Sequence, residues 1–259
     1  MRVNTTKAKL AEGKVVLGGI VSGFSPEIVE LLGLLGYDFV FLDCEHGSMS
    51  VGEVEHMVRA AEAFDITPIA RIPNHEDSTI LRFLDRGVQG LIIPHINTAE
   101  AAREVAAASR YHPHGHRGSA SGRAHDYGVN LPRPESMAFI NDNVLVIPMC
   151  EEVEAVQNLD SILAVPGIDV VHVASGDLGQ SMGHPPTAEV RAVMADVVRR
   201  TKAAGKWAGI GGNAPTDTAG VAELIREGAQ FVTVPALGLL RIGAEGFKNG
   251  VAAALAAGK

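Results

Sequence analysis

Residues 38–94 read DFVFLDCEHGSMSVGEVEHMVRAAEAFDITPIARIPNHEDSTILRFLDRGVQGLIIP, and in them two segments of helical character separate three short apolar runs. The runs are rich in Val and Ile and mostly lack polar alternation, as expected of strands that are covered on both faces. The first helical segment follows Ser50 and the second ends at Gly87, where helices commonly begin and end. This alternation predicts a parallel sheet.

The same unit recurs along the whole chain. The expected strands are Val15–Ile20, Asp38–Asp43, Thr67–Arg71, Gly90–Pro94, Val144–Met149, Asp169–Ala174, Trp207–Gly211 and Phe231–Pro235. The expected helices are Pro26–Leu35, Val51–Ala63, Ser78–Arg86, Thr98–Ser109, Val153–Ala164, Ala188–Ala204 and Asp217–Glu227. This pattern predicts one (β/α)8 barrel domain over residues 1–259, with an open doubly wound sheet as the alternative architecture.

Two regions fall outside the alternation. The longest irregular stretch is His112–Glu135, between the fourth and fifth strands, and a loop of this length favours a functional, substrate-facing role. The tail, Ala236–Lys259, has the composition of an apolar, Ala-rich helix. It is either the eighth helix of the barrel or a segment that packs in part on a neighbouring subunit.

Composition excludes several classes of partner. The formal net charge is −8, which argues against nonspecific binding of nucleic acid or of an anionic membrane. The N-terminus lacks an apolar signal core and no apolar run could span a bilayer, so we expect a cytoplasmic protein. Two cysteines, Cys44 and Cys150, cannot build a disulfide framework, and we expect both to be small buried packing residues.

Charged residues gather where the expected strands end, which is where barrels of this kind carry their active sites. The second strand ends in Asp43-Cys44-Glu45-His46-Gly47, and the third ends in Arg71. Glu151 and Glu152 follow the fifth strand, and Ser175-Gly176-Asp177 follows the sixth. We therefore expect a charged site at this rim.

The pair Glu151 and Asp177 indicates a metal site. Neighbouring strands lie about 4.8 Å apart, and two carboxylates held so close repel unless a cation or proton lies between them. Mg²⁺ fits such a pair and leaves its other positions to water and substrate, but Mn²⁺ and Co²⁺ also accept oxygen ligands. The alternative is that one carboxylate caps a helix and pairs with Arg or Lys.

Arg71 and His46 complete the candidate machinery. The planar fork of Arg71 suits a carboxylate, although an ion pair with Glu45 or Glu151 is compatible with the same position. His46 is the acid/base candidate, and either Asp43 or Asp85 could orient its ring. In the long loop, Arg117 and Arg123 could meet an anionic substrate. For His112, His114 and His116, the alternative to a substrate-facing role is that their rings are simply exposed to solvent.

Absences narrow the chemistry. Every lysine lies at position 7, 9, 14, 202, 206, 248 or 259, and none of these ends an expected strand, as a Schiff-base aldolase requires. The sequence has no Walker loop and no G-x-G-x-x-G after a strand, and Gly209, Gly211 and Gly212 hint only weakly at a phosphate cradle. Carbon–carbon chemistry in this barrel would therefore need a metal.

The chain resembles the HpcH/HpaI family, the class II pyruvate aldolases of aromatic and sugar-acid catabolism. The matching segments are FVFLDCEHG (39–47), IARIP (69–73), FLDRGVQGLIIP (83–94), RYHPHGHRG (110–118), PMCEEVEAVQNL (148–159), ASGDLGQSMG (174–183) and EGAQFVTV (227–234). They follow in order through nearly the whole chain. The resemblance implies a phosphoenolpyruvate/pyruvate-type TIM barrel.

The resemblance also implies roles for particular residues. Glu151 and Asp177 would be the metal ligands, and Arg71 would bind the keto-acid and steady its enolate. His46 would act as acid/base with Asp43 and Asp85, and the backbone around Ser175 and Gly176 would hold the pyruvyl carboxylate. The family further suggests a homohexamer, a trimer of dimers with an exchanged last helix.

Three positions depart from the family pattern. Met149 stands where relatives often carry Gln, Ala174-Ser175-Gly176-Asp177 replaces G-P-x-D, and a Trp common near the end of the first strand is replaced around Ile20. These changes bear on which keto-acid donor and aldehyde acceptor the site takes.

The expected reaction is retro-aldol cleavage of a 4-hydroxy-2-oxo acid to an aldehyde and pyruvate or hydroxypyruvate. One alternative is a lyase acting on a CoA thioester, which calls for a basic surface. Another is a non-catalytic barrel that binds a small anion without metal, against which the charged rim argues.

Overall fold

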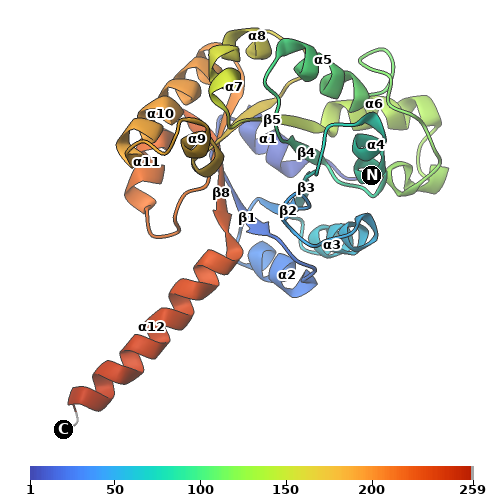
Figure 1. Cartoon of the computed structure of the whole chain (residues 1–259). Coiled ribbons are helices and arrows are strands. Elements are labelled where there is room, and N and C mark those ends of the chain that lie inside the picture. Colours follow the sequence, from blue (N-terminus) through green and yellow to red (C-terminus); the bar gives the residue numbers. More distant parts are fainter. Residues whose placement is uncertain (258–259) are drawn as a thin grey trace.

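Eight parallel strands pair in chain order and close into a barrel in the computed structural model, which describes residues 1–257 (Figure 1). The strands are β1 (Val16–Val21), β2 (Phe39–Asp43), β3 (Thr67–Arg71), β4 (Gly90–Ile93), β5 (Leu145–Cys150), β6 (Val170–Ala174), β7 (Trp207–Gly211) and β8 (Ala229–Pro235). The ring closes between β1 and β8, with Val16 opposite Phe231. The barrel prediction is confirmed, and every expected strand is found within two residues of its predicted ends.

Helices precede the first strand, connect each strand to the next and follow the last strand. They are α1 (Thr5–Ala11), α2 (Pro26–Leu34), α3 (Val51–Ala63), α4 (Asp77–Asp85), α5 (Ala99–Ala108), α6 (Arg133–Asn143), α7 (Val153–Gln157), α8 (Leu159–Leu163), α9 (Ser175–Ser181), α10 (Thr187–Ala203), α11 (Thr218–Glu227) and α12 (Ala236–Ala257). The start of α3 is fixed by a capping box, in which Ser50 and Glu53 each bond the other's backbone. Asn158 divides the expected helix Val153–Ala164 into α7 and α8.

The N-terminal helix α1 closes the end of the barrel at which the strands begin. Leu10 joins the apolar interior and is 1% exposed. Polar groups on α1 donate hydrogen bonds to the residues that precede β2 and β5. The Thr6 hydroxyl donates to the carbonyl of Asp38, and the Lys7 ammonium donates to the carbonyl of Val144. The opposite end of the barrel, where the strands finish, is left for a site.

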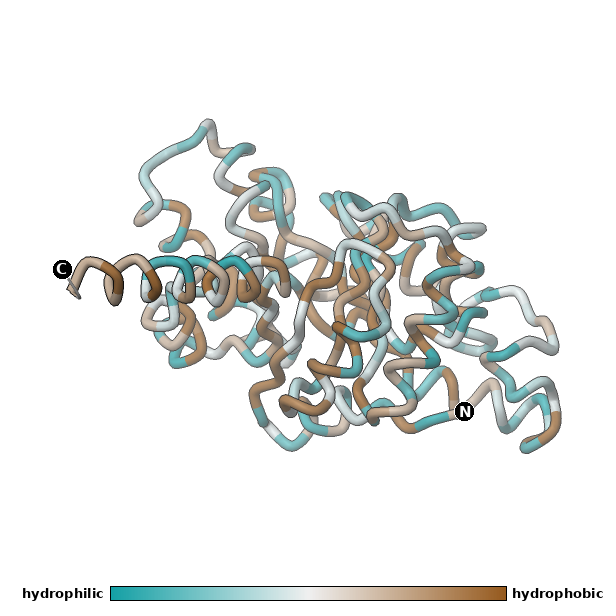
Figure 2. Tube along the Cα trace, turned by 90° about the horizontal axis from the view of Figure 1, so that it is seen from below, coloured by the Kyte–Doolittle hydropathy of each residue, from teal (hydrophilic) through white to brown (hydrophobic). Residues whose placement is uncertain are grey.

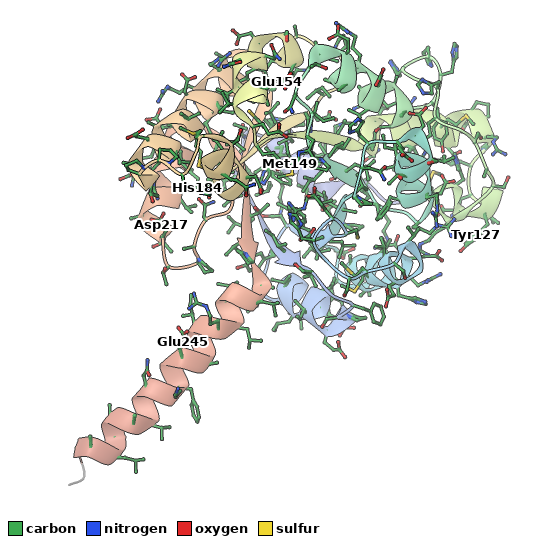
Figure 3. The ribbon with its side chains drawn as sticks, in the orientation of Figure 1. Tyr127, Met149, Glu154, His184, Asp217 and Glu245 are labelled. Carbon is green, nitrogen blue, oxygen red and sulfur yellow. The ribbon has the colours of Figure 1, made fainter. Side chains whose placement is uncertain are left out.

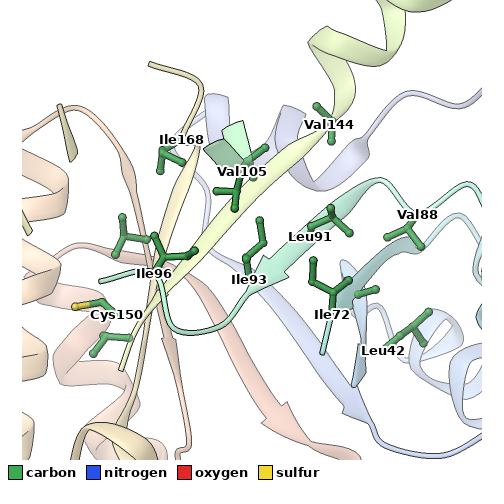
Figure 4. Packing of buried hydrophobic residues seen from close by; sticks show 14 of the residues in the cluster. Leu42, Ile72, Val88, Leu91, Ile93, Ile96, Val105, Val144, Cys150 and Ile168 are labelled. Atoms are coloured by element: carbon green, nitrogen blue, oxygen red, sulfur yellow. The ribbon is translucent and has the colours of Figure 1, made fainter. Parts of the chain in front are cut away.

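Two apolar layers hold the barrel together. Strand residues alternate in direction, so one set fills the interior and the other faces the helices. The outer layer packs β4 against α5, as Ile93 and Val105 show in Figure 4. The hydropathy tube shows the apolar strands enclosed by more polar helices (Figure 2). The sheet is therefore buried on both faces, which explains why its strands lack polar alternation.

The long stretch His112–Glu135 lies on the outside of α4 instead of facing the rim. It contains the short 3-10 helix η1 (Arg123–Gly128) and the start of α6. Arg117 pairs with Asp85 at 2.8 Å, and Arg123 pairs with Glu62. Both arginines are paired with acids on outer helices, so the structure does not bring them to the charged rim at the strand ends.

The last helix, α12, leaves its own barrel. It projects away from the strands over its 22 residues, and none of them is buried (Figure 1). Leu240, Phe247 and Leu255 are 65%, 77% and 70% exposed. The interpretation of this segment as the packed eighth helix of the same barrel is therefore wrong. Residues 258 and 259 of the predicted tail lie outside the described part of the chain.

Candidate active site

The charged side chains at the rim continue the inward-facing series of their strands, just beyond the last apolar residue of the core. Phe39, Phe41 and Asp43 alternate inward on β2, and Ile69 and Arg71 do so on β3. On β5 the inward series Leu145, Ile147 and Met149 continues to Glu151, and Figure 3 shows Met149 near the centre of the barrel. The same period of two that builds the core therefore aims these charges at the mouth.

Arg71 and Asp43 form a buried bidentate ion pair. The Arg71 Nε and Nη2 donate to the two Asp43 oxygens at 3.0 and 2.8 Å, and Nη1 lies 3.2 Å from Glu45 Oε2. The two residues are 9% and 3% exposed. Burial opposes the charged form of Asp43, but the hydrogen bonds and charge of Arg71 outweigh it and lower its pKa. Asp43 therefore fixes the guanidinium in the floor of the site.

Glu151 is a carboxylate under electrostatic strain. It is 2% exposed, and burial, followed by the charges of Asp177 and Glu45, raises its pKa; the backbone N–H of His95 donates to its Oε1 at 2.9 Å and offsets part of this. Asp177 is half-buried in the first turn of α9. The repulsion between two neighbouring carboxylates is relieved when a cation binds between them.

The donor set fits a hard divalent cation. Residues 1–257 hold no cluster of three or more His, Cys, Asp or Glu side chains able to bind a metal. A pair of carboxylates is nonetheless what Mg²⁺-type sites use when substrate and water complete the coordination. Glu152 is turned aside, because its oxygens bond the His95 ring at 2.7 Å and the Asn97 amide at 2.8 Å. Of the two acids after β5, Glu151 alone faces Asp177.

His95 belongs to the site and the sequence reading missed it. Its backbone is left-handed, with φ of +57°, which turns its N–H toward Glu151. Its ring stands between Glu152 and Glu45, 3.7 Å from the latter. The hydrogen bond to Glu152 is the largest of the effects that raise its pKa. The HIN sequence after β4 gave no strand-end charge pattern that would have identified it.

His46 and Asp85 lie differently from the expected relay. The His46 ring is exposed, and Asp43 accepts a hydrogen bond from its backbone N–H at 3.2 Å. Asp85 lies at the last residue of α4, paired with Arg117, so it does not join His46 within one chain. Of the two acids expected to orient the ring, the structure brings only Asp43 beside His46, and through the backbone.

Ser175, Gly176 and the glycines of β7 shape one wall. The Ser175 hydroxyl donates to the carbonyl of Gly212 at 2.9 Å, and Gly176 is exposed with open space at its Cβ position. A Cβ at Gly212 would lie 2.5 Å from the Ser175 Oγ, so glycine is required for this close approach. The wall offers free backbone at the start of α9.

The remaining candidates are structural. Burial raises the pKa of both Cys44 and Cys150 to about 12, which confirms them as packing residues. The rings of His112, His114 and His116 are all exposed, and His116 bonds Asp77 at 2.9 Å.

Within residues 1–257, no lysine stands at the carboxyl end of a strand. No helix of that part of the chain is long and apolar enough to cross a membrane.

Comparison with known proteins shows which family the chain resembles. Residues 18–241 match the model of the HpcH/HpaI aldolase/citrate lyase family. The chain is 36% identical over 237 residues to the 2-keto-3-deoxy-L-rhamnonate aldolases of Shigella sonnei and Escherichia coli K12, covering 89% of this chain and 86% of each relative. The HpcH/HpaI aldolase of Desulfitobacterium hafniense DCB-2 superposes with a TM-score of 0.85 at 30% identity, over 94% and 95% of the two chains.

A second solved structure shows the range of chemistry on this fold. The citrate synthase SbnG superposes with a TM-score of 0.84 at 28% identity, over 96% of this chain and 98% of its own.

The fold and the rim define a carbon–carbon lyase of the aldolase class that depends on a divalent metal. The chain belongs to the HpcH/HpaI aldolase/citrate lyase family. Membership confirms the resemblance seen in the sequence and removes the alternative of a non-catalytic barrel.

Proposed function

We propose that this chain cleaves a 4-hydroxy-2-oxo acid reversibly to an aldehyde and pyruvate or hydroxypyruvate, with Glu151 and Asp177 as ligands of Mg²⁺, Mn²⁺ or Co²⁺. The observation that carries the proposal is the buried Glu151, whose pKa is raised by burial and by Asp177, beside the fixed guanidinium of Arg71. A divalent cation bound by the two carboxylates would act as a Lewis acid toward the carbonyl of the keto-acid.

Arg71 is the residue that meets developing negative charge. Asp43 and Glu45 hold three of its N–H groups, and its other N–H groups are left for an oxygen of the substrate. When the C3–C4 bond breaks, its electrons move onto the carbonyl oxygen and form an enolate. A guanidinium already fixed in place stabilises that charge without reorganising, which is the largest single contribution in many enzymes.

The other rim residues bind the acid and move protons. The backbone N–H groups of Ser175 and Gly176 would hold the carboxylate of the keto-acid, since both stand free at the start of α9. His46, exposed at the mouth, would take the proton of the C4 hydroxyl and return a proton to C3 of the enolate through water. Asp43 supports it by fixing the backbone of the His46 turn.

The unpacked helix α12 supports the oligomeric assembly that the family resemblance implies. We infer a homo-oligomer, a trimer of dimers, in which α12 of one single-barrel subunit covers the apolar face beside β1 and α2 of another. Leu17, Leu31 and Leu34 on that face are 44%, 55% and 73% exposed, and the apolar side chains of α12 are exposed as well. Apolar surfaces of this extent are rare on monomers. Asp85, distant from His46 within one chain, would serve its expected role only across such an interface.

The proposed metal site is tested by calorimetric titration of the apoprotein with MnCl₂. We expect one site per chain, lost in Glu151→Gln and in Asp177→Asn and kept in Glu152→Gln, because Glu152 faces His95 and Asn97. Equal loss of affinity in Glu152→Gln, or full affinity in Glu151→Gln, would remove the assignment.

A further inference from the structure

His172 is a buried histidine inside the barrel that none of the steps above uses. It is the third residue of β6 and faces the interior between Val170 and Ala174, 2% exposed. Its ring stands edge-on to Phe41 and Phe231, with centroids 6.5 and 5.7 Å apart. An apolar side chain would suit these neighbours better than an imidazole does.

The glycines of β7 make room for this ring. A Cβ at Gly209 would lie 2.7 Å from its Nδ1, and a Cβ at Gly211 would lie 2.5 Å from its Nε2. Because Gly211 is the last residue of β7, the ring stands upright along the strand, with Nε2 toward the mouth of the barrel. The glycines that hinted at a phosphate cradle in the sequence therefore accommodate a histidine.

The imidazole is neutral and incompletely paired. Its Nδ1 has no hydrogen-bond partner within residues 1–257. Burial, with a smaller effect of the Arg71 charge, lowers the pKa of His172 to about 3, so the ring carries no charge at neutral pH. A buried polar atom without a partner destabilises the fold, and the atom concerned is Nδ1, which lies beside Gly209 on the side of the ring away from the mouth.

His172 lies directly beneath the wall assigned to the keto-acid. Gly211, beside Nε2, is followed by Gly212, whose Cβ position is 2.5 Å from the Ser175 Oγ and 3.3 Å from the Gly176 backbone nitrogen. One residue of a strand rises about 3.3 Å, so Nε2 lies about one residue layer below that backbone. An acid whose carboxylate were bound there and whose other end pointed toward the barrel axis would lie over the ring of His172.

We propose that His172 selects 2-oxo acids that carry a hydroxyl group on the third carbon, so that the donor is hydroxypyruvate in preference to pyruvate. This inference rests on the proposed function. The third carbon is the end of the acid farthest from the carboxylate and nearest the axis. A hydroxyl group both donates and accepts, so it pairs with Nε2 in either tautomer, whereas a methyl group leaves Nε2 unpaired.

The test compares two donors in the full-length, metal-loaded enzyme. kcat/KM is measured for addition of hydroxypyruvate and of pyruvate to the same aldehyde, in the wild type, His172→Phe, His172→Gln and Ile147→Leu. Ile147 faces the same apolar interior from the neighbouring strand β5, two residues below Met149 and away from the rim, so Ile147→Leu is the volume-conserving control for packing. We expect His172→Phe to shift the hydroxypyruvate-to-pyruvate ratio toward pyruvate by about 5- to 150-fold.

The companion variants separate selection from structure. His172→Gln should keep part of the preference, and Ile147→Leu should leave the ratio unchanged. An equal fall for both donors in His172→Phe would overturn the proposal, as would the same shift in Ile147→Leu. If His172→Phe fails to fold, Gly211→Ala gives the comparison, because its Cβ displaces the ring.

A binding measurement keeps the two proposals distinguishable. Calorimetric titration of the metal-loaded protein with each acid reports selection without turnover. If the wild type joins neither donor to an aldehyde, the proposed aldolase function fails, and the ratio of the two dissociation constants in wild type and His172→Phe still decides the inference. Equal ratios in the two proteins would refute it.

Discussion

Replacement of Arg71 by Ala removes the partner of a buried carboxylate, and its cost follows from the geometry of the pair. Asp43 is 3% exposed and loses two hydrogen bonds of 3.0 and 2.8 Å. Breaking a buried pair on one side costs about 3–5 kcal/mol of folding free energy. The backbone N–H groups of Glu45 and His46 still reach Asp43, so we expect a loss near the lower end, about 3 kcal/mol.

The pH dependence of that loss identifies its cause. Arg71 lowers the pKa of Asp43 in the folded chain, so the pair stabilises the fold above the ordinary Asp pKa of about 3.9. This contribution disappears as the pH falls through the folded-state pKa, when Asp43 takes up a proton. The gap in stability between wild type and Arg71→Ala should therefore be constant from neutral pH to about pH 5 and narrow below about pH 4.

Urea unfolding at fixed protein concentration measures the gap at both ends of this range. Arg103→Ala is the control, because Arg103 pairs with Glu100 on the surface at 57% and 73% exposure, and such pairs contribute about 0–1 kcal/mol. The reasoning is refuted if Arg71→Ala loses no more stability than Arg103→Ala at pH 7. It is refuted equally if the gap stays the same below pH 4.

Three further outcomes follow from the structure. Burial raises the pKa of Cys44 and Cys150 to about 12, so we expect a thiol reagent at pH 8 to label them only when the protein unfolds. Rapid labelling of either cysteine in the native protein would contradict their burial. Phe247→Asp on α12 should shift the assembly to smaller species in analytical ultracentrifugation, while Asn249→Asp does not, because Phe247 is 77% exposed in one chain and lies on the helix proposed to form the interface. An unchanged oligomer would remove α12 from the interface. Borohydride with pyruvate should leave no covalent adduct by mass spectrometry, because no lysine in residues 1–257 ends a strand, and an adduct would point to Schiff-base chemistry.

The barrel could be predicted from the sequence because each strand is buried on both faces, by the barrel interior on one side and by the helices on the other. The predicted strands Asp38–Asp43 and Thr67–Arg71 are mainly apolar runs that end in a charge, and their ends lie within one residue of those of β2 and β3. The helices α1, α6 and α9 were missed. The first is short and polar, the second begins inside the stretch interpreted as a loop, and α9 contains two glycines, Gly176 and Gly179, which weaken a helical pattern.

The site was predicted in part for a similar reason. Arg71, Asp43, Glu151 and Asp177 stand at strand ends, and strand ends in a barrel meet at one rim. His95 escaped notice because its contribution depends on a left-handed backbone beyond β4. Tertiary packing decides the rest. The apolar pattern of α12 does not reveal that the helix leaves its own barrel, and spacing along the chain does not reveal that Asp85 pairs with Arg117.

The central claim is that carbon–carbon cleavage here depends on a metal held by Glu151 and Asp177. Its most direct test is pyruvate and hydroxypyruvate release from 4-hydroxy-2-oxo acids, with and without a hydroxyl on the third carbon, after stripping by EDTA and resupply of Mg²⁺ or Mn²⁺. We expect activity to vanish on stripping and return with metal in the wild type, and not to return in Glu151→Gln. Cleavage that persists without metal, or that metal restores fully in Glu151→Gln, would contradict the account.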